Sequence, residues 1–345
     1  MTPEIINAIL DWFGIHARAL PWRKDATPYH VWLSEILLQQ TRIAAVLVAY
    51  RRFLEHYPTV EDLANGDVAT LMKLWEGLGY YSRARNLKKC AQVVTERGGF
   101  PRTAEELQML PGIGPYTAGA IAAIAFNQPA VAVDGNVARV VSRLLGRTLS
   151  REATAEFLRP WLPAGKAGAF VQAWMELGEL LCLPRGKPHC EECPLRAHCN
   201  ALKANRTDEL PAKPPRPARP VIKLTVFHLT SKDGRIALRK RPPTGLLAGL
   251  WEFPNCPGSL SAVQAKKWLE EQGFSVRNLA TEPPTRHLFT HREWQMANFQ
   301  ATVSPESSLF LWATPDELEN QYALPTAFRN PQGRRKAHGN KKLNP

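Results

Sequence analysis

The sequence lacks any run of about 18 apolar residues, the length that a helix needs to span a bilayer. Its first ten residues include Glu4 and lack the basic stretch that opens a secretory signal peptide. Because neither an export signal nor a membrane segment is found, we expect a bacterial-type cytoplasmic protein that does not act at a membrane.

Acidic residues are scarce relative to basic ones: 31 Asp and Glu against 44 Lys and Arg give a formal net charge of +13. This excess suits a polyanion, because each phosphate that a protein neutralises releases counterions. Charge alone leaves open nucleic acid, an anionic membrane surface, or an enzyme that is merely basic. With 44% hydrophobic and 22% charged residues among 345, the chain has the composition of a soluble globular protein and the length for two domains.

Strand-like alternation is nearly absent from the first 200 residues, where apolar residues recur at spacings of three and four. This pattern predicts a helical domain over residues 1–202. The predicted helices include 43–57, 68–75, 104–110 and 117–126. Residues 203–220 contain five prolines and few large apolar side chains, which predicts a semi-rigid linker.

The pattern changes after the linker to short β-rich runs, two of which flank a turn at 231–234. The predicted strands and helix lie at 221–229, 235–239 and 294–303, and at 262–272. Together they indicate an α+β domain over residues 221–328. Residues 329–345 are basic and turn-rich, and we expect this tail to be disordered.

Residues 110–114, Leu-Pro-Gly-Ile-Gly, place two glycines on either side of one apolar residue. Gly112 and Gly114 permit a tight turn whose N–H groups point outward at a helix start, where they bind phosphate oxygens. Ile113 is expected to point inward. Alone, this pattern is usually an ordinary connection between helices. Asp134, just before a helix predicted at 137–145, makes the functional interpretation the better one.

Residues 110–120, followed by Val-Asp-Gly-Asn at 133–136, resemble the helix-hairpin-helix–Gly/Pro–Asp superfamily of base-excision glycosylases. Within it, residues 32–41 (WLSEILLQQT) and 77–81 (GLGYY) resemble the adenine DNA glycosylase (MutY) family. The resemblance runs from Leu-Pro-Trp-Arg at 20–23 into the C-terminal domain, so it covers nearly the whole chain. It implies a mostly α helix-hairpin-helix glycosylase domain with an iron–sulfur loop, followed by an α+β Nudix (MutT-like) domain.

The same resemblance implies a base-excision repair enzyme. Its relatives hydrolyse the N-glycosidic bond of adenine mispaired with 8-oxoguanine or guanine in double-stranded DNA. We expect the protein to act on that substrate as a monomer.

Two carboxylates suit this reaction, because one can protonate the departing base while the other stabilises an oxocarbenium-like sugar. Glu35 lies in an apolar stretch that should raise its pKa and keep it protonated. Asp134 precedes a helix start, which favours its ionised form. The resemblance assigns the same roles, with Glu35 as general acid toward adenine N7 and Asp134 as stabiliser of the sugar cation. A lone glutamate in such a helix is usually solvated, but the second carboxylate in a matching motif disfavours that alternative.

Relatives that also cut the DNA backbone have a lysine after the hairpin, which forms a Schiff base with the sugar. This sequence has Pro115 and Tyr116 there, and a phenol cannot form an imine. The motif match therefore implies a monofunctional glycosylase without efficient lyase activity. Tyr116 is expected to support the site, and Asn136 joins the catalytic group.

The target base must leave the duplex, and other groups must fill its place. The resemblance implies that Gln39 and Tyr80 insert near the lesion pair, where a planar amide and an aromatic ring can stack. The alternative for Tyr80 is a core position, although Gly77 and Gly79 favour a loop. The carboxamide of Gln172 can pair with both a donor and an acceptor on adenine. The other residues assigned to adenine or DNA binding are Trp22, Arg23, Leu38, Gln40 and Thr41.

Four of the six cysteines are crowded into one stretch, which without an export signal indicates metal ligands rather than disulfides. Seven, two and five residues separate Cys182, Cys190, Cys193 and Cys199. A single C-x-x-C pair favours a Cys-ligated 4Fe–4S cluster over zinc, for which two such pairs are typical. The glycosylase family has its cluster here with six residues in the first gap, so the seventh is a departure. His189 and His198 are expected to be solvated rather than ligands.

The C-terminal domain resembles the Nudix fold attached to adenine glycosylases. Nudix hydrolases carry a Gly-x5-Glu-x7-Arg-Glu-x2-Glu-Glu-x-Gly box whose carboxylates bind a divalent metal. When Glu270, Glu271 and Gly273 are aligned with the end of that box, Lys266 and Lys267 occupy the Arg-Glu positions. The ligands are therefore incomplete, and we expect this domain to recognise rather than hydrolyse.

Residues 286–291, Arg-His-Leu-Phe-Thr-His, match the family's loop for sensing 8-oxoguanine, with Thr290 in place of the usual serine. The resemblance implies that Phe289, Thr290 and His291 read the lesion, and the alternative is a purely structural loop. Two other functions stay open. Tyr116 disfavours a bifunctional endonuclease III-like pyrimidine glycosylase, and the paired carboxylates disfavour a lesion-binding protein without catalysis.

Overall fold

The structure is a computed structural model that describes residues 2–212 and 217–329. Its contacts divide the chain into two compact units, Met1–Asn65 with Arg85–Pro215, and Gly66–Ala84 with Arg216–Pro345. From the sequence we expected two domains that are each continuous along the chain. We did not predict that Gly66–Ala84 groups with the second unit. The predicted domain boundaries themselves stay predictions.

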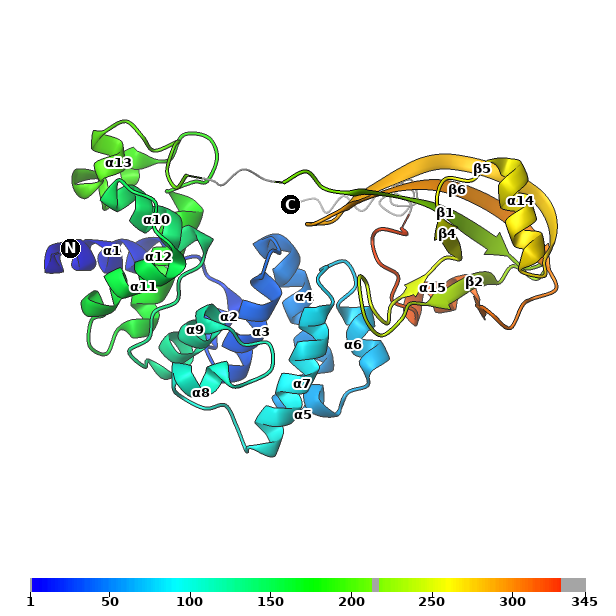
Figure 1. Ribbon diagram of the computed structural model, residues 1–345. Helices are drawn as coiled ribbons and strands as arrows, with labels where there is room; N and C mark the ends of the chain where they lie inside the picture. Colours follow the sequence, from blue (N-terminus) through cyan, green and yellow to red (C-terminus); the bar gives the residue numbers. More distant parts are fainter. Residues whose placement is uncertain (1, 213–216, 330–345) are drawn as a thin grey trace, which may run out of the picture. The chain divides into compact units, whose positions relative to one another are not determined.

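Every regular element in the described part of the first unit is a helix, as the apolar spacing predicts (Figure 1). The α-helices are α1 (Pro3–His16), α2 (Pro21–Lys24), α3 (Pro28–Leu38), α4 (Ile43–His56), α5 (Val60–Asn65), α7 (Ser82–Glu96), α8 (Ala104–Gln108), α9 (Pro115–Phe126), α10 (Gly135–Leu145), α11 (Arg151–Leu158), α12 (Ala167–Leu180) and α13 (Asn200–Lys203). Short 3-10 turns lie at η1 (Arg159–Trp161), η2 (Cys190–Glu192) and η3 (Arg196–His198). The helices predicted in this unit are confirmed, with small differences at their ends.

The ends of α9 and α10 follow from local chemistry. Pro115 starts α9 because the first turn of a helix does not need its missing N–H. Asp134 caps α10 by accepting a hydrogen bond from Val137 N at 2.7 Å. Gly146 ends α10 with a φ of +71°, a left-handed conformation that glycine adopts without strain.

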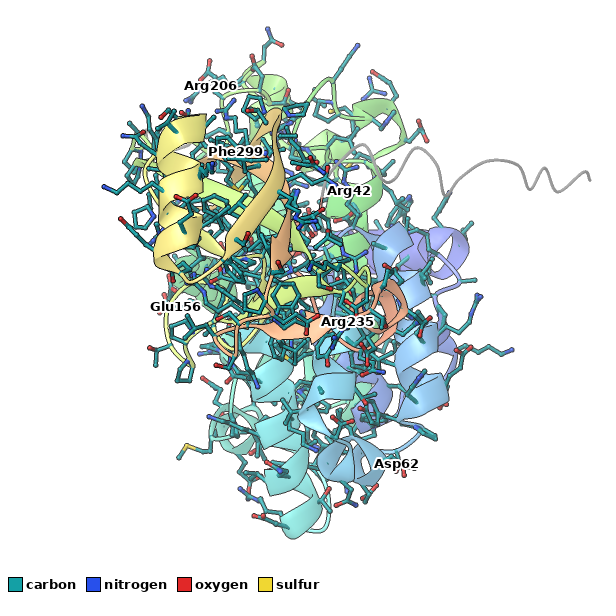
Figure 2. The ribbon with its side chains drawn as sticks, turned by 90° about the vertical axis from the view of Figure 1, so that its right-hand side faces the viewer. Arg42, Asp62, Glu156, Arg206, Arg235 and Phe299 are labelled. Carbon is teal, nitrogen blue, oxygen red and sulfur yellow. The ribbon has the colours of Figure 1, made fainter. Side chains whose placement is uncertain are left out.

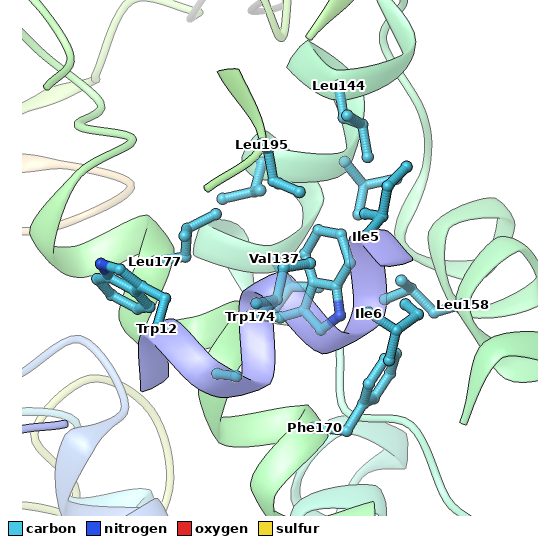
Figure 3. Packing of buried hydrophobic residues seen from close by; sticks show 14 of the residues in the cluster. Ile5, Ile6, Trp12, Val137, Leu144, Leu158, Phe170, Trp174, Leu177 and Leu195 are labelled. Carbon is cyan, nitrogen blue, oxygen red and sulfur yellow. The ribbon is translucent and has the colours of Figure 1, made fainter. Parts of the chain in front are cut away.

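One apolar cluster of this unit joins α1, α10 and α12 (Figure 3). Trp174 of α12 lies at its centre and is 1% exposed. It packs with residues that include Ile5, Ile6, Val137, Leu158, Phe170 and Leu177. Burying side chains of this size contributes roughly 2 kcal/mol each. This cluster fixes α10, and therefore Asp134, against α12.

A second cluster packs α9 against α12 at close range. A Cβ at Gly168 of α12 would lie 2.8 Å from the carbonyl oxygen of Ala123 in α9. Only a residue without a side chain allows this approach. The contact brings Tyr116 at the start of α9 toward Met175 of α12, and both residues border this cluster.

The second unit contains α6 (Val68–Leu74) and a sheet. Its elements are β1 (Val221–Thr230), β2 (Ile236–Lys240), β3 (Trp251–Glu252), β4 (Asn255–Pro257), α14 (Ala262–Glu271), β5 (Ser275–Leu288), β6 (Glu293–Ser304), β7 (Leu311–Ala313) and α15 (Pro315–Asn320). The strand order is β3-β2-β1-β6-β5, with β1 parallel to β6 and β5 antiparallel to it. The strands and helices predicted at 68–75, 221–229, 235–239, 262–272 and 294–303 are confirmed.

Apolar side chains along β1 and β6 alternate between the two faces of this sheet, and an apolar cluster covers each face. Phe227 and Phe299 pack against Ala265 and Leu269 of α14, and Figure 2 shows Phe299 on the strand beside that helix. Alternate residues face the opposite cluster, which includes Leu224, Val226, Trp294, Met296 and Phe328. This period of two explains why the sequence reveals β1 and β6 readily.

Strand β5 was not predicted, and it contains Pro283 and Pro284, which are uncommon in strands. The structure accommodates both prolines because β5 lies at the edge of the sheet, where missing donors are tolerated. Register shifts between Arg277 and Ala280, and between Glu282 and Thr285, mark irregular pairing with β6.

The segment Gly66–Ala84 is bound to the C-terminal residues of its own unit. Glu76 accepts hydrogen bonds from Arg329 Nε at 2.8 Å and from Leu324 N at 3.2 Å. Lys73 Nζ donates to the carbonyl oxygen of Tyr322 at 3.2 Å. These bonds explain why α6 groups with the sheet rather than with its neighbours in sequence.

The predicted linker is only partly described. Leu210 is buried and accepts a hydrogen bond from Arg143 Nε at 2.9 Å, and Ala212 N donates to Thr148 at 2.8 Å. The first part of the proline-rich segment is thus packed on the helical unit. The tail expected to be disordered lies, from residue 330, outside the described residues. Among the helices that the structure describes, none is long and apolar enough to cross a membrane.

Candidate active site

Glu35 lies on α3 with 5% of its surface exposed. Thr27 caps this helix by accepting from His30 N, and Pro28 occupies its first turn. The hydroxyl of Tyr116 donates to Oε2 of Glu35 at 2.6 Å. Burial raises the pKa of Glu35 to about 7, against the lowering effect of this hydrogen bond. The expected protonatable carboxyl in apolar surroundings is therefore present.

Asp134 faces the same site. Its charge raises the pKa of Glu35, and the charges of both carboxylates raise the pKa of the buried Tyr116 hydroxyl. The structure thus brings Glu35, Tyr116 and Asp134 together from α3, α9 and the start of α10. No two of these residues are neighbours in the sequence.

The helix start and burial have opposite effects on the pKa of Asp134. The helix start was expected to favour its ionised form, but the pKa of Asp134 is raised because burial is the largest effect. Hydrogen bonds from Val137 N at 2.7 Å and from Asn136 Nδ2 at 2.9 Å oppose this rise. Sequence shows a helix start but does not show how deeply the cap is buried.

Asn136 connects Asp134 to the cysteine-rich loop. Its Nδ2 also donates to Glu179 at 2.8 Å, and its Oδ1 accepts from Arg139 Nη2 at 2.8 Å. Arg139 Nε in turn donates to the carbonyl oxygen of Cys182 at 2.8 Å. Arg139 was missed by sequence reasoning, although its place four residues before Arg143 on one face of α10 was a usable signal.

The residues predicted to hold adenine form a charged network on α2 and α12. Arg23 Nε donates to Gln172 Oε1 at 3.0 Å, and Gln172 Nε2 donates to Gly168 O at 3.1 Å. The guanidinium of Arg23 also binds the buried Glu176. Glu176 and its second partner, Arg18, were not predicted. An acidic residue four positions after Gln172, on an otherwise apolar helix face, was the signal available.

Two other predicted pocket residues differ in exposure. Trp22 is buried and packs edge-on against Tyr50 with ring centroids 5.2 Å apart. Leu38 is half-buried at the end of α3. Trp22 therefore occupies a core position in this structure.

The loop after α3 carries Gln39, Gln40 and Thr41. Gln39 Nε2 donates to Thr117 at 3.5 Å, so this loop lies near the start of α9. Gln40 is exposed and has a φ of +57°, which is rare for a residue with a side chain. Such conformations are concentrated at functional sites.

The glycine hairpin has the expected shape. Ile113 is buried at 5% exposure, whereas Gly112 and Gly114 are exposed. Gly112 has a φ of +77°, and a Cβ there would lie 2.6 Å from Cβ of Asn86. Gly114 is the N-cap of α9. The hairpin therefore presents a helix start to solvent.

Tyr80 and Thr290 lie together in the second unit, where their hydroxyl groups are hydrogen-bonded. Tyr80 is 44% exposed with a φ of +48°, so it occupies a loop rather than the core. Thr290 and His291 are exposed in the turn between β5 and β6. Phe289 is half-buried against Trp294, with ring centroids 4.9 Å apart.

Two of the four clustered cysteines, Cys182 and Cys199, contact Arg143 of α10. Arg143 Nη1 donates to Cys182 Sγ at 3.3 Å, and Cys199 Sγ donates to Arg143 O at 3.5 Å. Burial, together with the smaller effect of charges on the other three cysteines, raises the pKa of Cys193 to about 12, against the lowering effect of a hydrogen bond with the backbone of Leu195. Among the described residues, no three His, Cys, Asp or Glu side chains are arranged as a metal site. The donor set suits iron–sulfur chemistry, but the structure does not show a cluster.

Comparison with known proteins agrees with this arrangement. Residues 33–163 match the HhH-GPD superfamily of base excision DNA repair proteins, and residues 225–330 match the NUDIX domain. An adenine DNA glycosylase from Rattus norvegicus is 36% identical over an alignment covering 93% of this chain and 76% of that protein. One from Homo sapiens is 35% identical, covering 82% of this chain and 62% of that protein.

Solved structures resemble the helical part. A thermostable thymine-DNA glycosylase is 32% identical with a TM-score of 0.53, covering 58% of this chain and 95% of that chain. Endonuclease III in a non-covalent DNA complex is 27% identical with a TM-score of 0.52, covering 59% of this chain and 98% of that chain. The fold, the paired carboxylates and these relatives together show that the chain belongs to the adenine DNA glycosylase (MutY) family of the HhH-GPD superfamily, with a C-terminal NUDIX domain.

Proposed function

We propose that this enzyme of base excision repair is a monofunctional glycosylase that removes adenine paired with 8-oxoguanine or guanine from double-stranded DNA. The supporting observation is the pairing of a buried Glu35, whose pKa is about 7, with Asp134 in one site. A carboxyl with that pKa carries a proton in a large share of molecules at neutral pH, as a general acid requires.

The reaction follows from this arrangement. The Glu35 proton passes to N7 of adenine, so that the C1′–N9 bond breaks and its electron pair leaves with the base. The carboxylate of Asp134 stabilises the positive charge that develops on the sugar. Water then adds to C1′ and releases a proton, which leaves free adenine and an abasic site. Tyr116 orients the carboxyl of Glu35 through the 2.6 Å hydrogen bond.

The absence of efficient lyase activity is supported by the residue at position 116. Its hydroxyl is committed to Glu35, and a phenol cannot form an imine with the opened sugar. A bifunctional enzyme would need an amine at this place.

DNA contacts are assigned to exposed features of each unit. The helix start at Gly114 suits a phosphate group, and the exposed loop at Gln40 suits the gap left by the extruded base. In the second unit, we assign Tyr80 and Thr290, whose hydroxyl groups are hydrogen-bonded to each other, to contacts with the lesion pair. The net charge of +13 favours binding to DNA, which is a polyanion.

A 4Fe–4S cluster fits the chemistry of the cysteine loop. Cys182, Cys190, Cys193 and Cys199 would hold it as thiolates, and Arg143 beside Cys182 would offset their negative charge. When bound, such a cluster supplies a rigid cross-link and a one-electron redox centre. The seven-residue first gap is a loop insertion that does not alter the donor set.

The test is single-turnover excision from a duplex with adenine opposite 8-oxoguanine, with and without alkaline treatment. Glu35→Gln should reduce excision by about a thousandfold or more while the duplex is still bound. Glu156→Gln, the same exchange on an exposed residue of α11, is the matched control. Strand cleavage without alkali, or an active Glu35→Gln enzyme, would contradict the proposal. Excision of pyrimidines, or binding without excision, would favour the alternatives.

A further inference from the structure

Glu176 is a buried anion that the proposed chemistry does not use. It lies on α12, and its side chain is 1% exposed. Its Oε1 accepts hydrogen bonds from Arg18 N at 3.0 Å, Arg18 Nε at 2.7 Å and Arg23 Nη1 at 3.1 Å. Its Oε2 accepts from Arg18 Nη2 and Arg23 Nη2, both at 2.8 Å. Such a charge is costly to bury, and here five hydrogen bonds from two arginines compensate for it.

One carboxylate is therefore hydrogen-bonded to two guanidinium groups. Against the raising effect of burial, hydrogen bonds from Arg18 and Arg23 lower the pKa of Glu176 to about 2, which agrees with its being ionised at neutral pH. Arg23, with 16% of its side chain exposed, also stacks over Phe13 at 5.4 Å and donates to Gln172. The guanidinium of Arg23 is therefore held in place on three sides.

Arg23 is also an electrostatic neighbour of Glu35. The groups that act on Glu35 come from three elements: Arg23 of α2, Tyr116 of α9 and Asp134 at the start of α10. Beyond them, α12 presents Glu176 and Glu179, and Arg18 precedes α2. A positive charge beside Glu35 favours loss of its proton, whereas a negative charge favours retention.

We propose that Glu176 is a positioning residue which holds Arg23 and offsets its charge, so that the general acid Glu35 keeps its proton at neutral pH. The inference rests on the proposed function of Glu35. It explains why a cation can border the site without removing the proton that the reaction needs.

The test is the pH dependence of single-turnover excision by the full-length enzyme. A general acid must be protonated, so activity is present below its pKa and is lost as the pH rises through it. Glu176→Gln removes a negative charge and leaves Arg23 uncompensated, which lowers the pKa of Glu35. The alkaline fall in the excision rate should therefore move to lower pH by about one pH unit. At pH values above this fall, the rate of Glu176→Gln should be roughly tenfold lower than that of the wild type.

Glu176→Asp keeps the charge and should restore most of the wild-type profile. Glu156→Gln, the same exchange on an exposed residue of α11, should leave the alkaline fall in rate at the wild-type pH. A purely structural role would lower the rate equally at every pH, and that result would overturn the inference.

Two further measurements separate the possible failures. If Glu35→Gln is fully active, the proposed function itself is wrong and the inference falls with it. If Glu35→Gln is inactive but the alkaline fall in the excision rate of Glu176→Gln stays at the wild-type pH, only the inference is wrong. Should Glu176→Gln not fold, Arg23→Gln provides the opposite test, because loss of the cation must move this fall to higher pH. If the alkaline fall in the excision rate of Arg23→Gln stays at the wild-type pH, the inference is overturned.

Discussion

Tyr116 donates its hydroxyl proton to Oε2 of Glu35 at 2.6 Å, across 81 positions of sequence. The hydrogen bond stabilises the ionised form of the carboxyl, whereas burial stabilises the neutral form. The pKa of about 7 is therefore a balance between a desolvated site and one well-placed donor. Removing the hydrogen bond should raise the pKa of Glu35, and removing the burial should lower it.

Tyr116→Phe removes the donor and retains the ring. The pKa of Glu35 should rise above about 7, so the alkaline limb of excision should move to higher pH. The maximal rate should fall by about tenfold or less, because the acid is still present but less well oriented. Tyr29→Phe, which removes another buried hydroxyl bonded to Tyr57 O, is the control and should leave the limb unchanged. A limb that moves to lower pH would contradict the prediction.

Asp134 has separate roles in stability and in catalysis, and two variants distinguish them. Asn and Asp are equally good N-caps, so Asp134→Asn should change the free energy of unfolding by less than about 1 kcal/mol. Its excision rate should nevertheless fall by at least about a hundredfold, because the sugar cation loses its counter-charge. Asp134→Ala should lose the activity and also about 1 kcal/mol of stability. Denaturant unfolding and single-turnover excision measure the two effects, and a fully active Asp134→Asn enzyme would remove Asp134 from the mechanism.

Much of this site follows from the sequence, and the exceptions have physical causes. Glu35 and Asp134 stand in contiguous motifs, whose spacing identifies the helices that carry them. Glu176 belongs to no such motif, because its role depends on two arginines more than 150 positions away. The same limit applies to the depth at which Asp134 is buried.

The fold shows a similar division. Strands β1 and β6 alternate between two buried faces, which a period of two reveals. Strand β5 contains adjacent prolines, and only its position at the sheet edge makes them compatible with pairing. The membership of Gly66–Ala84 in the second unit depends on long-range bonds to Glu76.

Gly112 offers a test of the hairpin with a matched control in the same unit. Gly112 and Gly98 have similar φ angles, +77° and +75°, but an added Cβ would meet a neighbour within 4 Å only at Gly112, where it would overlap Asn86. Gly98→Ala should cost about 1 kcal/mol from backbone strain alone. Gly112→Ala should cost more, about 3 kcal/mol, because strain and a steric overlap add. It should also weaken duplex binding at moderate salt, whereas Gly98→Ala should bind normally. Equal effects of the two variants in unfolding and binding measurements would show that the close packing at Gly112 is unimportant.

The cysteine loop makes a prediction that spectroscopy can check. Cys199→Ser should reduce visible absorbance and iron content, because four thiolates are needed to hold a 4Fe–4S cluster. Cys256→Ser, in the second unit, should leave both unchanged. Because Cys182 and Cys193 border the apolar cluster centred on Trp174, loss of the iron–sulfur cluster should also destabilise α10 and α12. Stoichiometric zinc and no visible absorbance in the purified protein would contradict this assignment.

The contact between Tyr80 and Thr290 bears on lesion discrimination. Both side chains are exposed, and their hydroxyl groups are bonded to each other within one unit. Thr290→Ala combined with His291→Ala should reduce the preference for 8-oxoguanine over guanine by about tenfold, as loss of one or two hydrogen bonds to the lesion predicts. Thr290→Ser, which keeps the hydroxyl and removes the methyl group, should retain the preference. The ratio of single-turnover rates on the two mispairs measures this effect. If the ratio is the same in all three proteins, the turn between β5 and β6 has only a structural role.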